Sequence, residues 1–417
     1  MRRQIEGARG VAETVAACRP HVVCAYPITP QTHIVEGLGV LVKTGALAPC
    51  EFVNVESEFA AMSVAIGASA AGARAYTATA GQGLLFMCEA LYNTSGLGLP
   101  VVMTVANRAI GAPINIWNDH SDAMSQRDSG WIQLYAETNQ EAMDLHLQAF
   151  RLAEELSVPV MVCLDGFVLT HAVEPLAVPD QAAVDAFLPP YAPRQVLDPD
   201  APLSIGAMVG PEAFTEVRYL AFHRQLEALR RIPEIAADFA ARFGRDSGGL
   251  LHTYRCDGAR TIVLAMGSVL GTLKDTVDEL RAQGEPVGVV GLTSFRPFPM
   301  EAVREALGGA ERVIVLERAF AAGVGGIVSA DVHTALAGLD RRRHTVVAGL
   351  GGRPVTRASL RAMLADALAG RLGPLTFLDL DHDLVKRELE RVRRHHRSGP
   401  AAENILRDIG TVAAGPH

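Results

Sequence analysis

Short apolar segments alternate along this chain with longer alanine-rich segments, and this alternation constrains the fold more than any other feature. In the first half, the expected strands are residues 21–25, 52–55, 75–79, 101–105 and 160–164. The expected helices between them are residues 31–44, 58–73, 83–96 and 140–156. Strands that alternate with helices typically form a parallel sheet with helices on both faces. The first half of the chain therefore predicts an α/β fold of the doubly wound type.

A second series of the same kind begins at Arg260. Its expected strands are residues 261–266, 286–291, 312–317 and 344–348, and its expected helices are residues 269–283, 300–307 and 326–337. Before it come a proline-rich stretch at about 187–210, an expected surface excursion, then an expected helix at 214–243 and a linker at 244–249. A chain of 417 residues is also too long for one core. We therefore expect two doubly wound domains, residues 1–250 and residues 258–417.

Composition narrows the possible partners. The formal net charge of −8 argues against nucleic acid or an anionic membrane surface as the main partner. No apolar run is long enough to span a bilayer, and the first residues lack the apolar segment of a secretory signal. The six cysteines include no Cys-x-x-Cys pair and no spacing typical of iron–sulfur or zinc sites. We expect a cytoplasmic protein that binds no metal or cluster through its own residues.

Two polar side chains follow expected strands at their carboxyl ends, where open α/β sheets bind their ligands. Thr29 lies between Pro27 and Pro30, and proline fixes its own φ and biases the preceding residue toward extended geometry. Arg108 follows the strand at 101–105, and a guanidinium group matches the two oxygens of a carboxylate. An ordinary turn at Thr29 and a surface ion pair at Arg108 are the simpler interpretations of these residues taken alone.

Glu58 opens the alanine-rich helix expected at 58–73. A carboxylate in this position interacts favourably with the helix dipole, by a few tenths to about 1 kcal/mol, which is a purely structural explanation. Glu56 competes with it for any chemical role, because residues two apart on a continuing strand face the same side. Strand alternation therefore does not separate the two carboxylates.

The segment at 77–85 is a glycine-rich turn from a strand into a helix, and it contains Thr79 and Gln82. Its glycines allow a ligand to approach the backbone closely, although the segment is not a dinucleotide-binding fingerprint. Further on, residues 115–127 include four closely spaced polar side chains, Asn118, Asp119, His120 and Asp122. They are too dense for a defined metal site and are typical of a capped, ion-paired loop.

Five blocks in a fixed order together resemble the α subunit of the 2-oxoacid:ferredoxin oxidoreductases, closest to the pyruvate:ferredoxin oxidoreductase (pyruvate synthase) branch. The blocks are residues 26–30 (Tyr-Pro-Ile-Thr-Pro), 56–61, 77–87, 106–109, and 115–122 with 125–128. The likeness continues more weakly to about residue 395. It implies an N-terminal domain of the type that binds the pyrimidine of thiamine diphosphate, followed by a domain like the C-terminal domain of transketolase.

The resemblance also implies roles for individual residues. Glu58 matches the glutamate that hydrogen-bonds N1′ of the cofactor's aminopyrimidine, and it is the expected catalytic residue. Thr79 and Gln82 match positions near the reactive end of the cofactor. Arg108 and the Thr29 hydroxyl match the groups that bind the substrate carboxylate, and residues 115–127 match a segment that lines the substrate side of the pocket.

A part of the expected active site is missing from this sequence. Thiamine diphosphate is normally bound through magnesium by a Gly-Asp-Gly motif, and the chain contains none. The resemblance implies that a β subunit supplies the diphosphate site, the magnesium and a [4Fe–4S] cluster. It implies in addition γ and δ subunits, or fused equivalents, that handle coenzyme A and pass electrons to ferredoxin.

We therefore expect the α subunit of a thiamine diphosphate-dependent enzyme that converts pyruvate and coenzyme A to acetyl-CoA and carbon dioxide while reducing ferredoxin, or runs the reverse synthesis. An enzyme for branched-chain 2-oxoacids such as 2-oxoisovalerate is an alternative within the same class. A non-catalytic cofactor-binding module is an alternative from another class. The convergence of Thr29, Glu58 and Arg108 in one place distinguishes the enzyme from the module.

Overall fold

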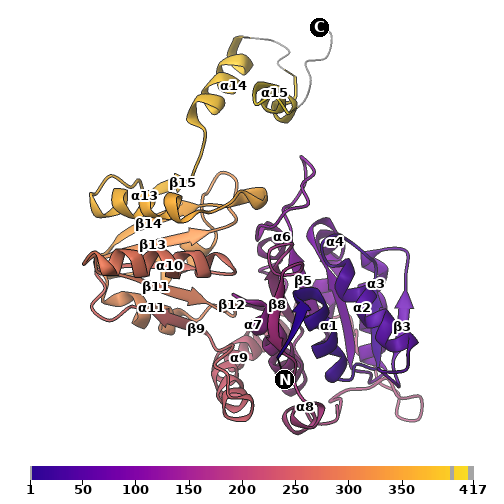
Figure 1. The fold of residues 1–417 in the computed structure, drawn as a ribbon. Coiled ribbons are helices and arrows are strands. Elements are labelled where there is room, and N and C mark those ends of the chain that lie inside the picture. The colour runs from indigo at the N-terminus through magenta and orange to yellow at the C-terminus, as the bar shows by residue number, and fades with distance from the viewer. Residues whose placement is uncertain (1, 395–398, 412–417) are drawn as a thin grey trace.

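The computed structural model describes residues 2–394 and 399–411, which contain two large sheets (Figure 1). The first sheet has seven strands in the order β12-β6-β7-β5-β4-β2-β3. They are β2 (Val22–Ala25), β3 (Glu51–Asn54), β4 (Ala75–Thr79), β5 (Val102–Asn107), β6 (Ile132–Tyr135), β7 (Val160–Asp165) and β12 (Ser294–Arg296). All neighbours run parallel except β12, which pairs antiparallel with β6.

Helices connect these strands and cover the sheet. They are α1 (Gly7–Ala17), α2 (Thr32–Lys43), α3 (Glu58–Ala70), α4 (Gly81–Phe86), α5 (Cys88–Gly96), α6 (Ser121–Ser125), α7 (Asn139–Leu156) and α8 (Gln181–Phe187). The expected helix at 83–96 is in fact two helices, because Met87 has ψ −6°, away from the α-helical value of about −42°. A separate antiparallel ribbon joins β1 (Arg2–Glu6) to β8 (Val173–Ala177).

The second sheet has six strands in the order β15-β14-β13-β10-β11-β9, all parallel to their neighbours except β9. They are β9 (Leu251–Tyr254), β10 (Thr261–Ala265), β11 (Val287–Leu292), β13 (Arg312–Glu317), β14 (Arg342–Val347) and β15 (Leu375–Phe377). Its helices are α10 (Val269–Ala282), α11 (Met300–Gly308), α12 (Val328–Ala335) and α13 (Arg357–Leu368), with a short 3₁₀ turn at Leu350–Gly352. Two doubly wound sheets confirm the predicted fold class.

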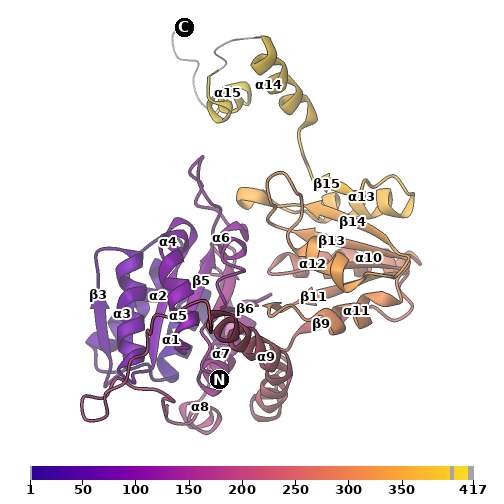
Figure 2. The ribbon, with the colours of Figure 1, turned by 180° about the vertical axis from the view of Figure 1, so that it is seen from behind.

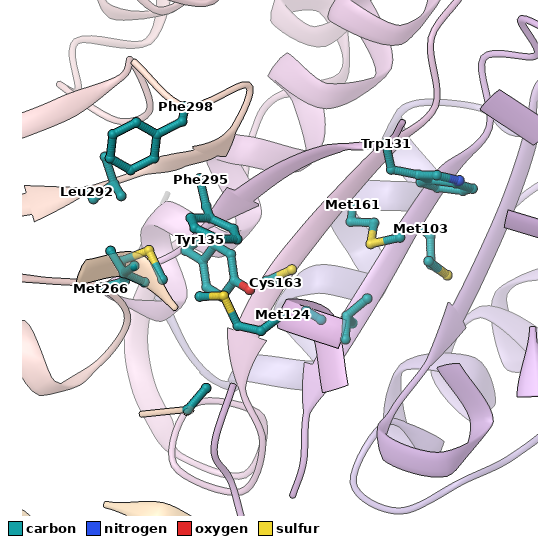
Figure 3. Packing of buried hydrophobic residues seen from close by; sticks show 14 of the residues in the cluster. Met103, Met124, Trp131, Tyr135, Met161, Cys163, Met266, Leu292, Phe295 and Phe298 are labelled. Atoms are coloured by element: carbon teal, nitrogen blue, oxygen red, sulfur yellow. The ribbon is translucent and has the colours of Figure 1, made fainter. Parts of the chain in front are cut away.

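The two sheets share part of their hydrophobic core. β12 lies beyond the expected start of the second domain, yet it pairs with β6 through Ser294 and Leu134. Figure 3 shows Phe295 beside Tyr135, and the two rings meet edge-on with centroids 6.2 Å apart. Met266, Leu292 and Phe298 extend this cluster on the side of the second sheet. The domain division at 250–258 stays a prediction. One strand from the C-terminal side of it, β12, belongs to the sheet of the N-terminal side.

The remaining segments lie outside the two sheets. Residues 188–213, all within the described chain, form no helix or strand, and they lead into α9 (Phe214–Phe243). Near the C-terminus, α14 (His382–Arg394) and α15 (Ala401–Asp408) stand apart from both sheets in both views (Figures 1 and 2). Among the described residues, no helix has the length and apolar character needed to cross a bilayer.

Candidate functional site

Glu58 is the first residue of α3, and the local sequence explains why the helix begins there. Ser57 has extended backbone geometry, and its hydroxyl oxygen accepts a hydrogen bond from the Ala60 N–H at 3.1 Å, which caps the helix. Glu58 is only 8% exposed, whereas Glu56 is exposed. Burial thus separates the two carboxylates that strand alternation could not.

Glu58 and Thr79 meet beside Gly83. A Cβ atom on Gly83 would lie 2.6 Å from Oγ1 of Thr79 and 2.7 Å from Oε1 of Glu58, so only glycine fits there without displacing one of them. Thr79 is the last residue of β4 and is fully buried. Its hydroxyl has no hydrogen-bond partner among the described residues. A buried unpaired hydroxyl is uncommon in a folded protein, and a ligand at this point would satisfy it.

Gln82, on the first turn of α4, reaches the loop between β5 and α6. Its Nε2 would lie 2.8 Å from a Cβ atom on Gly111, which brings the side chain against that loop. Its Oε1 is buried and has no hydrogen-bond partner within the described part of the chain. Thr79 and Gln82, expected beside Glu58 as cofactor-binding residues, therefore both carry an unsatisfied polar atom, and that of Thr79 lies beside Glu58.

The Arg108 side chain is buried, 7% exposed, and is oriented by two main-chain carbonyls. Its Nη1 donates to the carbonyl oxygen of Thr29 at 3.0 Å, and its Nε donates to that of Asn115 at 2.9 Å. Burial lowers the pKa of Arg108, an effect that the nearby Asp122 carboxylate opposes. The structure thus brings Thr29 and Arg108 together through the Thr29 main chain, while Thr29 itself is exposed.

The polar segment at 115–122 joins the carboxyl ends of the two sheets. Asp119 Oδ2 accepts a hydrogen bond from the Gly351 N–H at 3.0 Å, and Asn115 Nδ2 donates to the Gly351 carbonyl at 3.2 Å. His120 Nε2 lies 2.9 Å from Oδ1 of Asp165, the last residue of β7. Sequence analysis missed Asp165, although its position at the end of an apolar strand is the signal that pointed to Arg108.

Exposed apolar side chains surround the candidate site. Phe59 follows Glu58 and Phe86 ends α4, and their rings lie 6.3 Å apart. On the loop before α6, Ile114 is 83% exposed and Trp117 is 53% exposed. A cavity of about 1000 Å³ lies elsewhere, between α9 and residues 296–305. The candidate site therefore lies on a face with exposed apolar side chains, and large exposed apolar patches are typical of surfaces that bind another molecule.

Comparisons with known proteins identify the family to which this chain belongs. Residues 13–237 match the family model for pyruvate flavodoxin/ferredoxin oxidoreductase, thiamine diphosphate-binding, and residues 259–360 match core domain II of pyruvate:ferredoxin oxidoreductase. The N-terminal part is thus a domain of a thiamine diphosphate-binding family. The chain belongs to the pyruvate:ferredoxin oxidoreductase family, which confirms the resemblance found in the sequence.

Named relatives agree with this assignment. The chain is 47% identical over 390 residues to pyruvate synthase subunit PorA of Methanosarcina barkeri, covering 91% of this chain and 97% of that one. It is 43% identical over 377 residues to PorA of Thermotoga maritima, covering 88% and 95%. It is 40% identical over 369 residues to ketoisovalerate oxidoreductase subunit VorA of Pyrococcus abyssi, covering 88% and 93%.

One solved structure shows the same fold. It is a 2-oxoglutarate:ferredoxin oxidoreductase from Magnetococcus marinus with 2-oxoglutarate, coenzyme A and succinyl-CoA bound. The TM-score is 0.68 at 18% identity, and the match covers 88% of this chain and 65% of that chain. At this identity the similarity establishes the architecture alone.

Proposed function

We propose that this chain is the α subunit of a pyruvate:ferredoxin oxidoreductase. The complete enzyme would convert pyruvate, coenzyme A and two oxidised ferredoxins into acetyl-CoA, carbon dioxide, two reduced ferredoxins and a proton, or catalyse the reverse. The observation that carries the proposal is the convergence of Glu58, Thr79 and Arg108 around one glycine-rich turn. The sequence matches to PorA subunits of 43% and 47% identity support the same assignment.

The residues around Gly83 fit the pyrimidine end of thiamine diphosphate. Glu58 would hydrogen-bond a ring nitrogen, the unpaired Thr79 hydroxyl would donate to or accept from a polar group of the cofactor, and the unpaired Gln82 Oε1 would accept from one. When bound, this cofactor supplies the electron sink that decarboxylation of a 2-oxoacid requires. Glu58 would hold a proton at the pyrimidine, and its buried position keeps water away from that proton.

Arg108 is suited to the substrate carboxylate. Its Nε and Nη1 donate hydrogen bonds to the carbonyls of Asn115 and Thr29. Its Nη2 donates to no acceptor within the described residues. The guanidinium is therefore oriented before substrate arrives, which reduces the entropy lost on binding. We assign the 2-oxoacid carboxylate to Arg108 and the exposed Thr29 hydroxyl, and this placement would orient the carboxylate for loss as carbon dioxide.

The remaining parts of the active site would come from partner subunits. The chain has no Gly-Asp-Gly motif, and its candidate site opens onto a face with exposed Phe86, Ile114 and Trp117. We assign the diphosphate, its magnesium and a [4Fe–4S] cluster to a β subunit on this face. The γ and δ subunits, or their fused equivalents, would handle coenzyme A and pass electrons to ferredoxin.

Two alternatives make different demands on the site. The 40% identity to a ketoisovalerate subunit keeps branched-chain 2-oxoacids as a second substrate class, since both classes present the same carboxylate to Arg108. A non-catalytic cofactor-binding module would need the groups around Gly83 but would have no use for the buried Arg108, which the carbonyls of Thr29 and Asn115 orient toward a substrate carboxylate. The enzyme therefore accounts for more of the site than the module does.

The test is coenzyme A-dependent reduction of a low-potential dye by the purified complex of this chain with its partner subunits. Pyruvate, 2-oxoisovalerate and 2-oxoglutarate would be compared in wild type, Glu58→Gln and the matched control Glu56→Gln. We expect activity with pyruvate, loss of it in Glu58→Gln, and little change in Glu56→Gln, because Glu56 is exposed. Full activity in Glu58→Gln, or none with any 2-oxoacid in a complete wild-type complex, would overturn the proposal.

A further inference from the structure

We propose that Asp122 is a positioning residue for the 2-oxoacid site. Its carboxylate joins the main chain of Arg108 to the glycine turn at the start of α4, and so sets the distance between the substrate-binding and cofactor-binding groups. The inference rests on the proposed function and deepens it, because Asp122 acts through Arg108 and the turn and touches neither substrate nor cofactor.

Asp122 is completely buried, and both of its oxygens are fully engaged. Oδ2 accepts hydrogen bonds from the N–H groups of Gly81 and Arg108, each at 2.9 Å. Oδ1 accepts from Asn107 Nδ2 at 2.8 Å and from the Ala123 N–H at 2.7 Å. Four donors from three separate segments therefore meet on one carboxylate, which is the number that its lone pairs can accept.

The two segments bonded to Oδ2 are those that carry the candidate site. Gly81 has φ +50°, and a Cβ atom there would lie 3.0 Å from Cδ of Arg108, so the arginine stem packs directly on this glycine. Two residues further along the turn, Gly83 borders Glu58. A shift of Asp122 would therefore move Arg108 relative to Glu58, and a misplacement of 1 Å costs about 10²-fold in rate.

Stability alone gives a poor reason for this carboxylate. Burial raises the pKa of Asp122 to about 6, against the opposing effect of its hydrogen bonds from Asn107, Gly81, Arg108 and Ala123. A buried charge of this kind is often less stabilising than apolar residues of similar volume. A carboxylate is nevertheless the side chain that can accept hydrogen bonds from four donors at once. Asp122 uses this capacity to hold the segment of Arg108 against the turn at Gly81.

The test is Asp122→Asn in the complete complex, with steady-state kinetics for pyruvate and for coenzyme A. An amide replaces one acceptor oxygen with a donor, so one pair of N–H groups loses its partner. We expect the KM for pyruvate to rise about tenfold or more, as for one lost charge-assisted hydrogen bond, while the KM for coenzyme A stays unchanged. Asp128→Asn is the matched control, because Asp128 is an exposed carboxylate on the same segment.

A second comparison separates positioning from a merely structural role. If Asp122 acts through Arg108, Asp122→Asn alone will raise the KM for pyruvate. The same substitution made together with Arg108→Ala will raise the KM little beyond that of Arg108→Ala alone. A lower unfolding temperature with an unchanged KM for pyruvate, or effects that are additive with Arg108→Ala, would overturn the inference.

If Asp122→Asn fails to assemble, Asn107→Ala removes one of the four donors and should raise the KM for pyruvate by a smaller factor. An unchanged KM in Asn107→Ala would then count against the inference. Failure of the proposed function is a different outcome, since the wild-type complex itself would then be inactive toward every 2-oxoacid.

Discussion

Asp165 and Arg318 form a buried ion pair that joins the two sheets. Nη1 of Arg318 lies 3.1 Å from Oδ2 of Asp165, and the side chains are 7% and 0% exposed. Asp165 ends β7, and Arg318 directly follows β13, so the pair connects the carboxyl ends of two strands from different sheets. The same carboxylate accepts hydrogen bonds from the Ser268 N–H at 2.7 Å and the Ser268 hydroxyl at 2.5 Å. A buried, hydrogen-bonded ion pair thus joins the two sheets at this edge.

We expect Asp165→Asn to destabilise the fold by about 3–5 kcal/mol, because it leaves the buried Arg318 without its counter-charge. Burial by itself would raise the pKa of Asp165, but Arg318 and His120 outweigh it and hold that pKa well below its usual range. The stabilisation by this carboxylate is therefore present above about pH 4 and is lost only as the pH falls toward the lowered pKa. Urea unfolding at pH 7 measures the effect.

The control for this prediction is Glu311→Gln. Glu311 pairs with Arg260 at 2.7 Å, but the two side chains are 62% and 68% exposed, so their loss should change stability little. If both variants unfolded at the same urea concentration as wild type, the junction between the sheets would not depend on this pair.

Gly83→Ala should abolish most of the activity of the complex without unfolding the chain. The added methyl group would lie 2.6 Å from Oγ1 of Thr79 and 2.7 Å from Oε1 of Glu58, so it would displace the two groups expected at the cofactor. We expect a loss of about 10²-fold in the dye-reduction assay. Gly67→Ala on α3 is the control, because no atom beyond its chain neighbours and the nearby backbone of its own helix lies within 4 Å of the added Cβ, and activity should persist. Equal activity in the two variants would contradict the site.

His146 should make the fold less stable in mild acid. Burial lowers the pKa of His146 from 6.5 to about 4, although its hydrogen bond to the Ala142 carbonyl opposes the change. The unfolded chain therefore binds a proton on this histidine below about pH 6.5, whereas the folded chain does not until about pH 4. Stability falls as the pH drops through this window, by about 3 kcal/mol for this group at about 1.4 kcal/mol per pKa unit.

Comparison of wild type with His146→Gln isolates this contribution, because the other titrating groups are common to both. Thermal unfolding midpoints of the two chains would be measured between pH 4 and pH 7. The wild-type midpoint should fall more steeply with acid than that of the variant. Parallel curves would show that His146 is protonated equally in the folded and unfolded chains.

Phe86→Ser should weaken association with the partner subunit and leave this chain folded. Phe86 is 59% exposed, and its ring lies 6.3 Å from the ring of Phe59, the residue that follows Glu58. Burial of a phenylalanine contributes about 1.5–3 kcal/mol, which corresponds to an affinity loss of roughly tenfold or more. Analytical ultracentrifugation of the mixed subunits measures it. Met208→Ser, fully exposed in the segment 188–213, should have no such effect.

Much of this architecture could be predicted from local pattern. The strands at 75–79 and 312–317 and the helix at 214–243 have the expected bounds, because apolar periodicity is a property of neighbouring residues. The placement of Thr29 and Arg108 at strand ends also followed from local sequence, as did Glu58 at a helix start. Their proposed roles came from resemblance to a family, since periodicity carries no information about chemistry.

The sequence by itself determined the two doubly wound sheets and the short set of residues able to act at their carboxyl ends. The tertiary structure alone decided that Glu58 is buried while Glu56 is exposed, and that β12 crosses to the first sheet. It also decided that Asp122 and Asp165 each bind several distant segments. The physical reason is that burial and hydrogen-bond partners depend on where remote parts of the chain meet, and a local pattern does not encode those meetings.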